Sequence, residues 1–232
     1  MAAESSPAVS VVMATKNAER YLVESLDSVA AQTLSDLEII IVDADSTDAT
    51  RRIAESYPRV KVLPQNGAGF AHAWNVGIAA ARSDFISLLD SDDIWSATKL
   101  AEQLKYFSDH PSTECVVGRV QYFLSDGQSI PPGFKPSLLE GSHIAYMPGT
   151  SMIRRSIFED FGPFESRWQI TNDLIWFAKL RESGRAIGIL DDVVLKKRVH
   201  ASNLSYVTDG SIYRSELLQF LKESVLTRRT NG

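Results

Sequence analysis

The sequence predicts an α/β protein with a mostly parallel central sheet and helices on both of its faces. Over the first hundred residues, short apolar runs alternate with segments of helical periodicity. The run Leu37 to Val42 contains Ile-Ile-Ile-Val, which is typical of a strand buried on both faces, as in parallel sheets. Alternating strands and helices indicate right-handed crossovers between neighbouring parallel strands.

Four strand–helix pairs are expected in the first half of the chain. Leu22, Leu26 and Val29 recur at helical spacing, and Pro58 and Pro111 each follow a segment that they would end as a helix. The expected strands are residues 9–14, 37–42, 60–63 and 85–89. The expected helices are residues 20–31, 46–57, 70–81 and 97–109, the second capped by Ser46 or Thr47.

The pattern changes in the second half. We expect a strand over 115–123, a long surface loop over 124–143, and a short strand ending at Ile153. A helix over 172–183 is stopped by Gly184, a strand-like run covers 190–199, and an amphipathic helix covers 211–227. The Gly67-Ala68-Gly69 segment lacks the glycine spacing of a phosphate-binding loop and is interpreted as a loop break.

Composition narrows the classes of partner and location. The 232 residues carry a net charge of -5 with no basic stripe, so no nucleic-acid partner is expected. Cys115 is the single cysteine, which excludes an internal disulfide. No apolar run is long enough to span a membrane and no signal peptide is seen, so we expect a cytoplasmic protein. Association with the inner face of a membrane, and the oligomeric state, stay open.

The segment Asp90-Ser91-Asp92-Asp93 is the most informative for chemistry. It directly follows the buried strand 85–89, and ligands of parallel sheets gather at the carboxyl ends of strands. Three carboxylates this close repel one another unless solvent or a cation compensates them. Their oxygen atoms suit Mg²⁺ or Mn²⁺, which would hold a diphosphate. The alternative is a solvated turn with capping aspartates.

Other candidates lie near strand or helix ends, and each has a structural alternative. Asp43 could accept hydrogen bonds from a nucleoside or cap the next helix. Asp173 could be a general base or a charge that favours the helix dipole. Arg198 and His200 could meet a diphosphate or a cation, although a lone histidine is more often structural. Trp168 is expected in a loop where it could stack on a sugar ring, whereas the other three tryptophans are expected in the core.

Taken together, these pieces resemble the family-2 glycosyltransferases, which share the GT-A fold. The resemblance runs from about Val9 to Ser205. It rests on the order and spacing of eight pieces: Val-Ser-Val-Val-Met-Ala-Thr-Lys-Asn (9–17), Ser-Val-Ala-Ala-Gln (28–32), the stretch 38–48 that ends in an Asp-rich turn, Asn-Val-Gly-Ile (75–78), Leu-Asp-Ser-Asp-Asp-Ile-Trp (89–95), Phe-Gly-Pro-Phe (161–164), Asn-Asp-Leu-Ile-Trp (172–176) and His-Ala-Ser-Asn-Leu-Ser (200–205). It implies one GT-A domain over 1–232, with a Rossmann-like nucleotide-binding half (about 8–112), a smaller acceptor-binding half (about 113–206) and a C-terminal helix (about 211–228).

The resemblance also implies a reaction and its residues. Family members typically transfer a sugar from a nucleoside diphosphate sugar to an acceptor hydroxyl, with inversion and with Mg²⁺ or Mn²⁺; here the acceptor would be a glycan or a lipid-linked molecule. It assigns Asp173 as the base and Asp92 to the metal, and we also expect His200 at the metal and Trp168 at the acceptor. The nucleotide sugar would contact Thr15, Asn17, Asp43, Asn75, Asp90 and Arg198.

The sequence departs from the family pattern at three positions. Ala44 stands where a second aspartate often helps to hold uracil, so the base of the donor stays open. Lys16 replaces a common tyrosine, and Asn172 replaces the usual glutamate before the base. A module that binds a nucleotide sugar without transferring it is an alternative. A nucleotidyltransferase is disfavoured because residues 14–17 do not form a glycine-rich basic loop.

Overall fold

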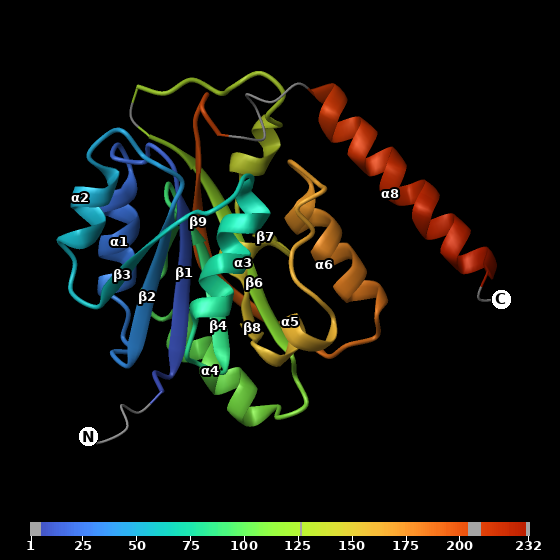
Figure 1. Ribbon diagram of the computed structural model, residues 1–232, viewed down its shortest axis with the longest axis horizontal. Helices are drawn as coiled ribbons and strands as arrows, with labels where there is room; N and C mark the ends of the chain where they lie inside the picture. Colours follow the sequence, from blue (N-terminus) through green and yellow to red (C-terminus); the bar gives the residue numbers. More distant parts are fainter. Residues whose placement is uncertain (1–5, 126, 204–209, 231–232) are drawn as a thin grey trace.

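The central feature of the fold is one mixed sheet that extends through the whole body (Figure 1). The computed structural model describes residues 6–125, 127–203 and 210–230, with side chains over 211–224 in the last segment. Within this part of the chain, nine strands pair in the order β3-β2-β1-β4-β8-β6-β9-β5, and β7 pairs with β6.

The first half contains the predicted parallel strands. They are β1 (Val9–Thr15), β2 (Leu37–Asp43), β3 (Val60–Pro64) and β4 (Phe85–Asp90), and all of their mutual pairings are parallel. The helices between and after them are α1 (Leu22–Ala30), α2 (Thr50–Glu55), α3 (Phe70–Ala80) and α4 (Lys99–Asp109). The fold class and the alternation of elements are therefore confirmed.

The second half extends the sheet with antiparallel and parallel pairs. Its strands are β5 (Ile94–Trp95), β6 (Cys115–Leu124), β7 (His143–Ile144), β8 (Met152–Arg154) and β9 (Ile187–Val199). Strand β8 is antiparallel to both β4 and β6, and β6 is parallel to β9. The remaining elements are α5 (Ser156–Asp160), α6 (Asn172–Glu182), α8 (Gly210–Thr230) and two short 3₁₀ turns, η1 (Pro136–Leu139) and η2 (Pro148–Thr150).

Helices cover both faces of the sheet, as predicted, because alternate strand residues point to opposite sides. On one face, Val12, Ile40 and Leu88 pack with residues of α3 and α6. On the other face, Val11 and Ile39 pack with residues of α1, α2 and α4. The approach of α3 is close: a Cβ atom on Gly77 would lie 2.3 Å from Val12 Cγ1, so this position requires glycine.

One helix start and several short elements differ from the prediction. The helix predicted from residue 46 begins only at Thr50, because Ser46 donates hydrogen bonds to Asp43 instead of capping the helix. Strand β9 begins three residues earlier than expected, at Ile187. The two-residue strands β5 and β7 were not predicted, since so short a segment has no periodic pattern.

Candidate active site

The loops that follow β1 and β2 are fastened to each other at the carboxyl edge of the sheet. Thr15 and Asp43 are register partners, and Thr15 Oγ1 donates to Asp43 Oδ1 at 3.1 Å. The backbone N–H of Asn17, a residue with φ of 47°, donates to Ser46 Oγ at 2.9 Å. Asn17 Oδ1 in turn accepts from the Thr47 N–H at 2.9 Å. Asp43 thus shapes the turn to Ser46, and the nucleoside role of these residues stays a prediction.

A cavity of about 480 Å³ opens beside these loops. This volume lies in the range of small-molecule sites, about 300–1,000 Å³. Ala44 is in its wall, at the position where the family often has a second aspartate. Both halves of the chain contribute to the lining, which comprises Ala14, Thr15, Lys16, Ala44, Asp45, Gln65, Gly67, Ala68, Gly69, Phe70, Ala73, Gln169 and Ile170.

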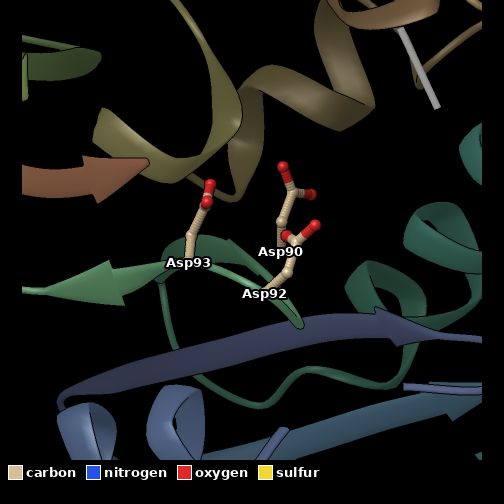
Figure 2. Close-up of side chains that lie close together, drawn as sticks. All are labelled: Asp90, Asp92 and Asp93. Atoms are coloured by element: carbon tan, nitrogen blue, oxygen red, sulfur yellow. The ribbon is translucent and has the colours of Figure 1, made fainter. Parts of the chain in front are cut away.

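The acidic segment forms a compact cluster at the end of β4. Asp90, Asp92 and Asp93 each place one carboxylate oxygen within 4.8 Å of the others. Figure 2 shows all three side chains on the same side of the turn, with Asp90 and Asp92 next to each other. Lys197, from β9, donates to Asp90 Oδ2 at 3.0 Å and to Asp93 Oδ2 at 2.9 Å. Its ammonium group therefore neutralises part of the cluster's charge.

The three aspartates have different environments. Complete burial raises the pKa of Asp93 to about 7, with the charges of Asp92 and Asp90 adding to burial and Lys197 opposing it. Burial also acts to raise the pKa of Asp92, but the hydrogen bond from His200 and the charge of Lys197 outweigh it and hold that pKa below its usual value. Although burial favours a neutral amine, the carboxylates around Lys197 raise its pKa well above the ordinary value.

The donor set fits a hard divalent cation. Asp90 Oδ1 is buried and has no hydrogen-bond partner within the described chain. A buried, unpaired carboxylate oxygen is unusual unless a ligand completes it. Asp92 Oδ2 lies 2.9 Å from His200 Nε2, and His200 Nδ1 is held by Ser202 Oγ at 2.8 Å. Asp93, by contrast, accepts from Lys197 and from the Arg198 backbone N–H at 2.8 Å, so it serves the turn itself.

Asp173 lies in the first turn of α6, within electrostatic range of the cluster. Burial raises its pKa to about 6, and the negative charge of Asp90 adds to the increase. The N–H of Leu174 and the charge of Lys197 partly offset this effect. The structure thus brings Asp173 within electrostatic range of Asp90, although 82 residues lie between them in the sequence. A carboxylate with a raised pKa is suited to proton transfer near neutral pH.

Two residues that are predicted to bind the nucleotide sugar form hydrogen bonds within the protein. Arg198 is buried, and its guanidinium donates to the Asp92 carbonyl oxygen, to Ser125 Oγ and to Glu24 Oε2. Through these hydrogen bonds, Arg198 fixes the turn that carries Asp90, Asp92 and Asp93. Asn75 holds the segment before α6 on α3, because its amide group donates to the Phe164 carbonyl at 2.8 Å and accepts from the Phe164 N–H at 3.1 Å. Their contact with a donor stays a prediction.

Trp168 lies in a loop, as predicted, but its ring is buried. Only 2% of it is exposed, and it packs with Ile175 and with Phe220 of α8. The Arg167 guanidinium covers it at 4.3 Å from the ring centre. A ring must be exposed to stack on a sugar, so this burial does not match the acceptor-stacking expectation. The other three tryptophans are buried in the core, as predicted.

Lys197 is a residue of the site that the sequence interpretation missed. A signal for it exists in the run Lys196-Lys197-Arg198 on a strand. Alternate residues of a strand point to opposite faces, so consecutive basic residues must present at least one toward each face. Because β9 is paired with β5, which directly follows the acidic turn, one of these cations reaches the aspartates.

Comparison with known proteins connects this geometry to a family. The family model for glycosyl transferase family 2 matches residues 10–162. A glycosyltransferase of Nostoc sp. is 33% identical over 186 residues, covering 71% of this chain and 56% of the relative. One of Rickettsia typhi is 30% identical over 234 residues, covering 94% of this chain and 73% of the relative. Both relatives are uncharacterized.

Solved structures share the fold at lower identity. TarS of S. aureus in complex with UDP-GlcNAc has a TM-score of 0.70 at 22% identity, covering 87% of this chain and 61% of that one. A mannosyltransferase of Pyrobaculum calidifontis in complex with GDP-Man and Mn²⁺ has a TM-score of 0.67 at 22% identity, covering 96% of this chain and 65% of that one. Within the described residues, no helix is both long enough and apolar enough to cross a membrane. With the family model matching from β1 through the acidic turn to α5, the chain belongs to glycosyltransferase family 2 and has its GT-A fold.

Proposed function

We propose that the chain transfers a sugar from a nucleoside diphosphate sugar to an acceptor hydroxyl, with inversion and with help from Mg²⁺ or Mn²⁺. One observation carries this proposal: Asp90, Asp92 and Asp93 form a cluster that could hold a cation, and Asp173 lies within electrostatic range of it. A cavity of suitable size opens at the same edge of the sheet. The biological setting that fits is the assembly of a polysaccharide, a lipopolysaccharide or another glycan.

For the donor, we propose that the nucleoside binds in the cavity and the diphosphate binds at the acidic cluster. The nucleoside would occupy the cavity lined by Thr15 and Ala44, with Asp90 near the ribose. Asp92 and His200 would hold the cation, whose chemistry is to neutralise the charge of the departing diphosphate. Because fold relatives bind UDP-GlcNAc and GDP-Man, and Ala44 removes one uracil-holding carboxylate, uridine and guanosine donors are both candidates.

The acceptor half assigns one proton transfer to Asp173. As the acceptor oxygen forms its bond to the anomeric carbon, the bond from that carbon to the diphosphate breaks. The proton of the acceptor hydroxyl passes to the Asp173 carboxylate. A single displacement of this kind inverts the anomeric centre and needs only one positioned base. Acceptor preference is proposed to depend on the loop at 124–143.

The pH profile is expected to follow Asp173. Since a base acts when it is deprotonated and the pKa of Asp173 is raised to about 6, kcat/KM should rise with pH through about 6 and then level off. At pH 5 it should be about tenfold below the plateau, one unit below the pKa. The measurement is kcat/KM from pH 4.5 to 8 at saturating Mn²⁺. A profile that is already flat above pH 5, as an aspartate with an ordinary pKa near 4 would give, would contradict the assignment.

Donor binding tests the function directly. We expect at least one sugar from a panel including UDP-GlcNAc and GDP-mannose to raise Tm by about 5–10 °C at a concentration near 100 times its Kd, because ligand binding stabilises the folded state. The shift should require Mn²⁺ or Mg²⁺ and disappear with EDTA. Donors that stabilise the chain are then assayed for nucleoside diphosphate release with added acceptors. If no donor gives a metal-dependent shift, the proposed function is wrong.

A further inference from the structure

The loop that leads into α6 is held from outside by the C-terminal helix. Glu216 of α8 is largely buried, and its carboxylate accepts four hydrogen bonds from this loop. The backbone N–H groups of Gln169, Ile170 and Thr171 donate to it at 2.6, 3.2 and 3.0 Å. Thr171 Oγ1 donates at 2.8 Å. Hydrogen bonds to an ionised acceptor are stronger than neutral ones, and they lower the pKa of Glu216 despite its burial.

Two more contacts on the same face of α8 reinforce this attachment. One turn further along the helix, Phe220 packs with Trp168 and Ile175. Three residues beyond it, Glu223 pairs with both terminal nitrogens of Arg167, at 3.1 and 2.9 Å. Positions 216, 220 and 223 follow the spacing of one helix face. Figure 1 shows α8 running alongside α6 at the edge of the molecule.

The inner side of the same loop belongs to the candidate active site. Gln169 and Ile170 line the 480 Å³ cavity. Thr171 directly precedes α6, whose first turn carries Asp173. Residues 169–171 therefore contact α8 through their N–H groups on one side. On the other side, Gln169 and Ile170 line the cavity, and Thr171 leads into the helix that carries Asp173. A displacement of this loop would move both this wall of the cavity and the Asp173 side chain.

We propose that α8 is a clamp on the active site and that Glu216 is a positioning residue for the cavity wall and for Asp173. The proposal rests on the proposed role of Asp173. Without the Glu216 carboxylate, the three N–H groups lose their acceptor and must turn to water, so the loop is no longer held to α8 at this point. Misplacement of a catalytic group by about 1 Å can cost about 100-fold in rate. The family match ends at residue 162, so this clamp lies beyond it.

The test compares three variants of the full chain. Glu216→Ala removes the acceptor, and Glu216→Gln keeps the size but leaves a single oxygen to receive the loop. Leu218→Ala, on the exposed face of the same helix, is the control. Hydrogen exchange at the amides of 169–171 reports on the clamp without any catalysis. Initial rates with a donor that stabilises the wild-type chain separate kcat from the KM for donor.

In Glu216→Ala, the amides of 169–171 should exchange at least about tenfold faster while those of β1 and β4 keep their protection. We expect kcat to fall about 10–100-fold and the KM for donor to rise by a smaller factor, since the base and the wall both move. Glu216→Gln should lie between this variant and wild type, and Leu218→Ala should match wild type. If Glu216→Ala does not fold, Glu216→Gln carries the comparison.

Two results would overturn the clamp: exchange at 169–171 that does not change, or faster exchange with wild-type kcat and KM. Failure of the proposed function gives a different result, because wild type itself would then transfer no sugar. In that case the affinity for UDP-GlcNAc or GDP-mannose with Mn²⁺, measured by calorimetry, decides the matter. A weaker affinity in Glu216→Ala supports the clamp, and an unchanged affinity refutes it.

Discussion

Replacing Asp173 with asparagine should lower kcat at least about 100-fold, within the about 10²- to 10⁴-fold range of general-base catalysis. Asparagine keeps the size of the side chain but cannot take the proton of the acceptor hydroxyl. Donor affinity should stay within a few fold of wild type, because the substitution leaves Asp90, Asp92 and the cavity in place. Steady-state rates and calorimetric titration with the donor and Mn²⁺ measure the two effects separately.

Stability separates loss of the base from loss of the fold. Because the native environment raises the pKa of Asp173 to about 6, ionising this group costs the folded state stability as pH rises through 6. The asparagine side chain carries no charge, so the Tm of Asp173→Asn at pH 8 should equal or exceed that of wild type. Asp160→Asn, which removes an exposed carboxylate at the end of α5, is the matched control and should keep wild-type kcat. A kcat within tenfold of wild type in Asp173→Asn would place the base elsewhere.

The parallel half of the fold could be predicted because its information is local. A strand buried on both faces leaves a continuous apolar run, as in Ile39 to Val42, and a helix packed on one face leaves a periodic one. Residues at the carboxyl ends of such strands are then marked as site candidates without knowledge of their partners. Thr15, Asp43 and Asp90 do end their strands in the structure, as this rule requires.

The contacts that residues of the second half make in the site could not be predicted, because each of them joins residues far apart in the sequence. Lys197 meets Asp90 across 107 positions, and Glu216 meets Thr171 across 45. No sequence period encodes such contacts. Trp168 is a further example. Its loop position suggested a ring available for a sugar, whereas Phe220 of a helix more than 40 residues later packs on it. The sequence therefore indicated which residue types carry the chemistry. The tertiary structure was needed to show that some of them, such as Arg198 and Asn75, form hydrogen bonds that hold the site together.

The two kinds of aspartate in the acidic turn should give opposite mutational results. Asp92 faces the candidate cation site with His200 and is partly exposed, whereas Asp93 is fully buried and holds Lys197 and the Arg198 N–H. Asp92→Asn should abolish the metal-dependent Tm shift by donor and lower kcat/KM at least about 100-fold. This loss exceeds the about 10- to 100-fold effects of residues that only support metal ligands. The Tm of the free variant should fall modestly at neutral pH, because the hydrogen bond from His200 and the charge of Lys197 favour the charged form of Asp92 in the folded state.

Asp93→Asn is the comparison that makes this result specific to the cation. It leaves Lys197 paired with Asp90, so no buried charge loses its last partner. Because the pKa of Asp93 is raised to about 7, its ionisation costs the folded state stability as pH rises through 7, and the neutral asparagine should leave the Tm at pH 8 close to that of wild type. Its residual donor binding should still respond to Mn²⁺, because Asp90, Asp92 and His200 remain. Equal metal dependence in Asp92→Asn and wild type would mean that Asp92 does not hold the cation. Loss of metal dependence in Asp93→Asn alone would instead assign that role to the buried aspartate.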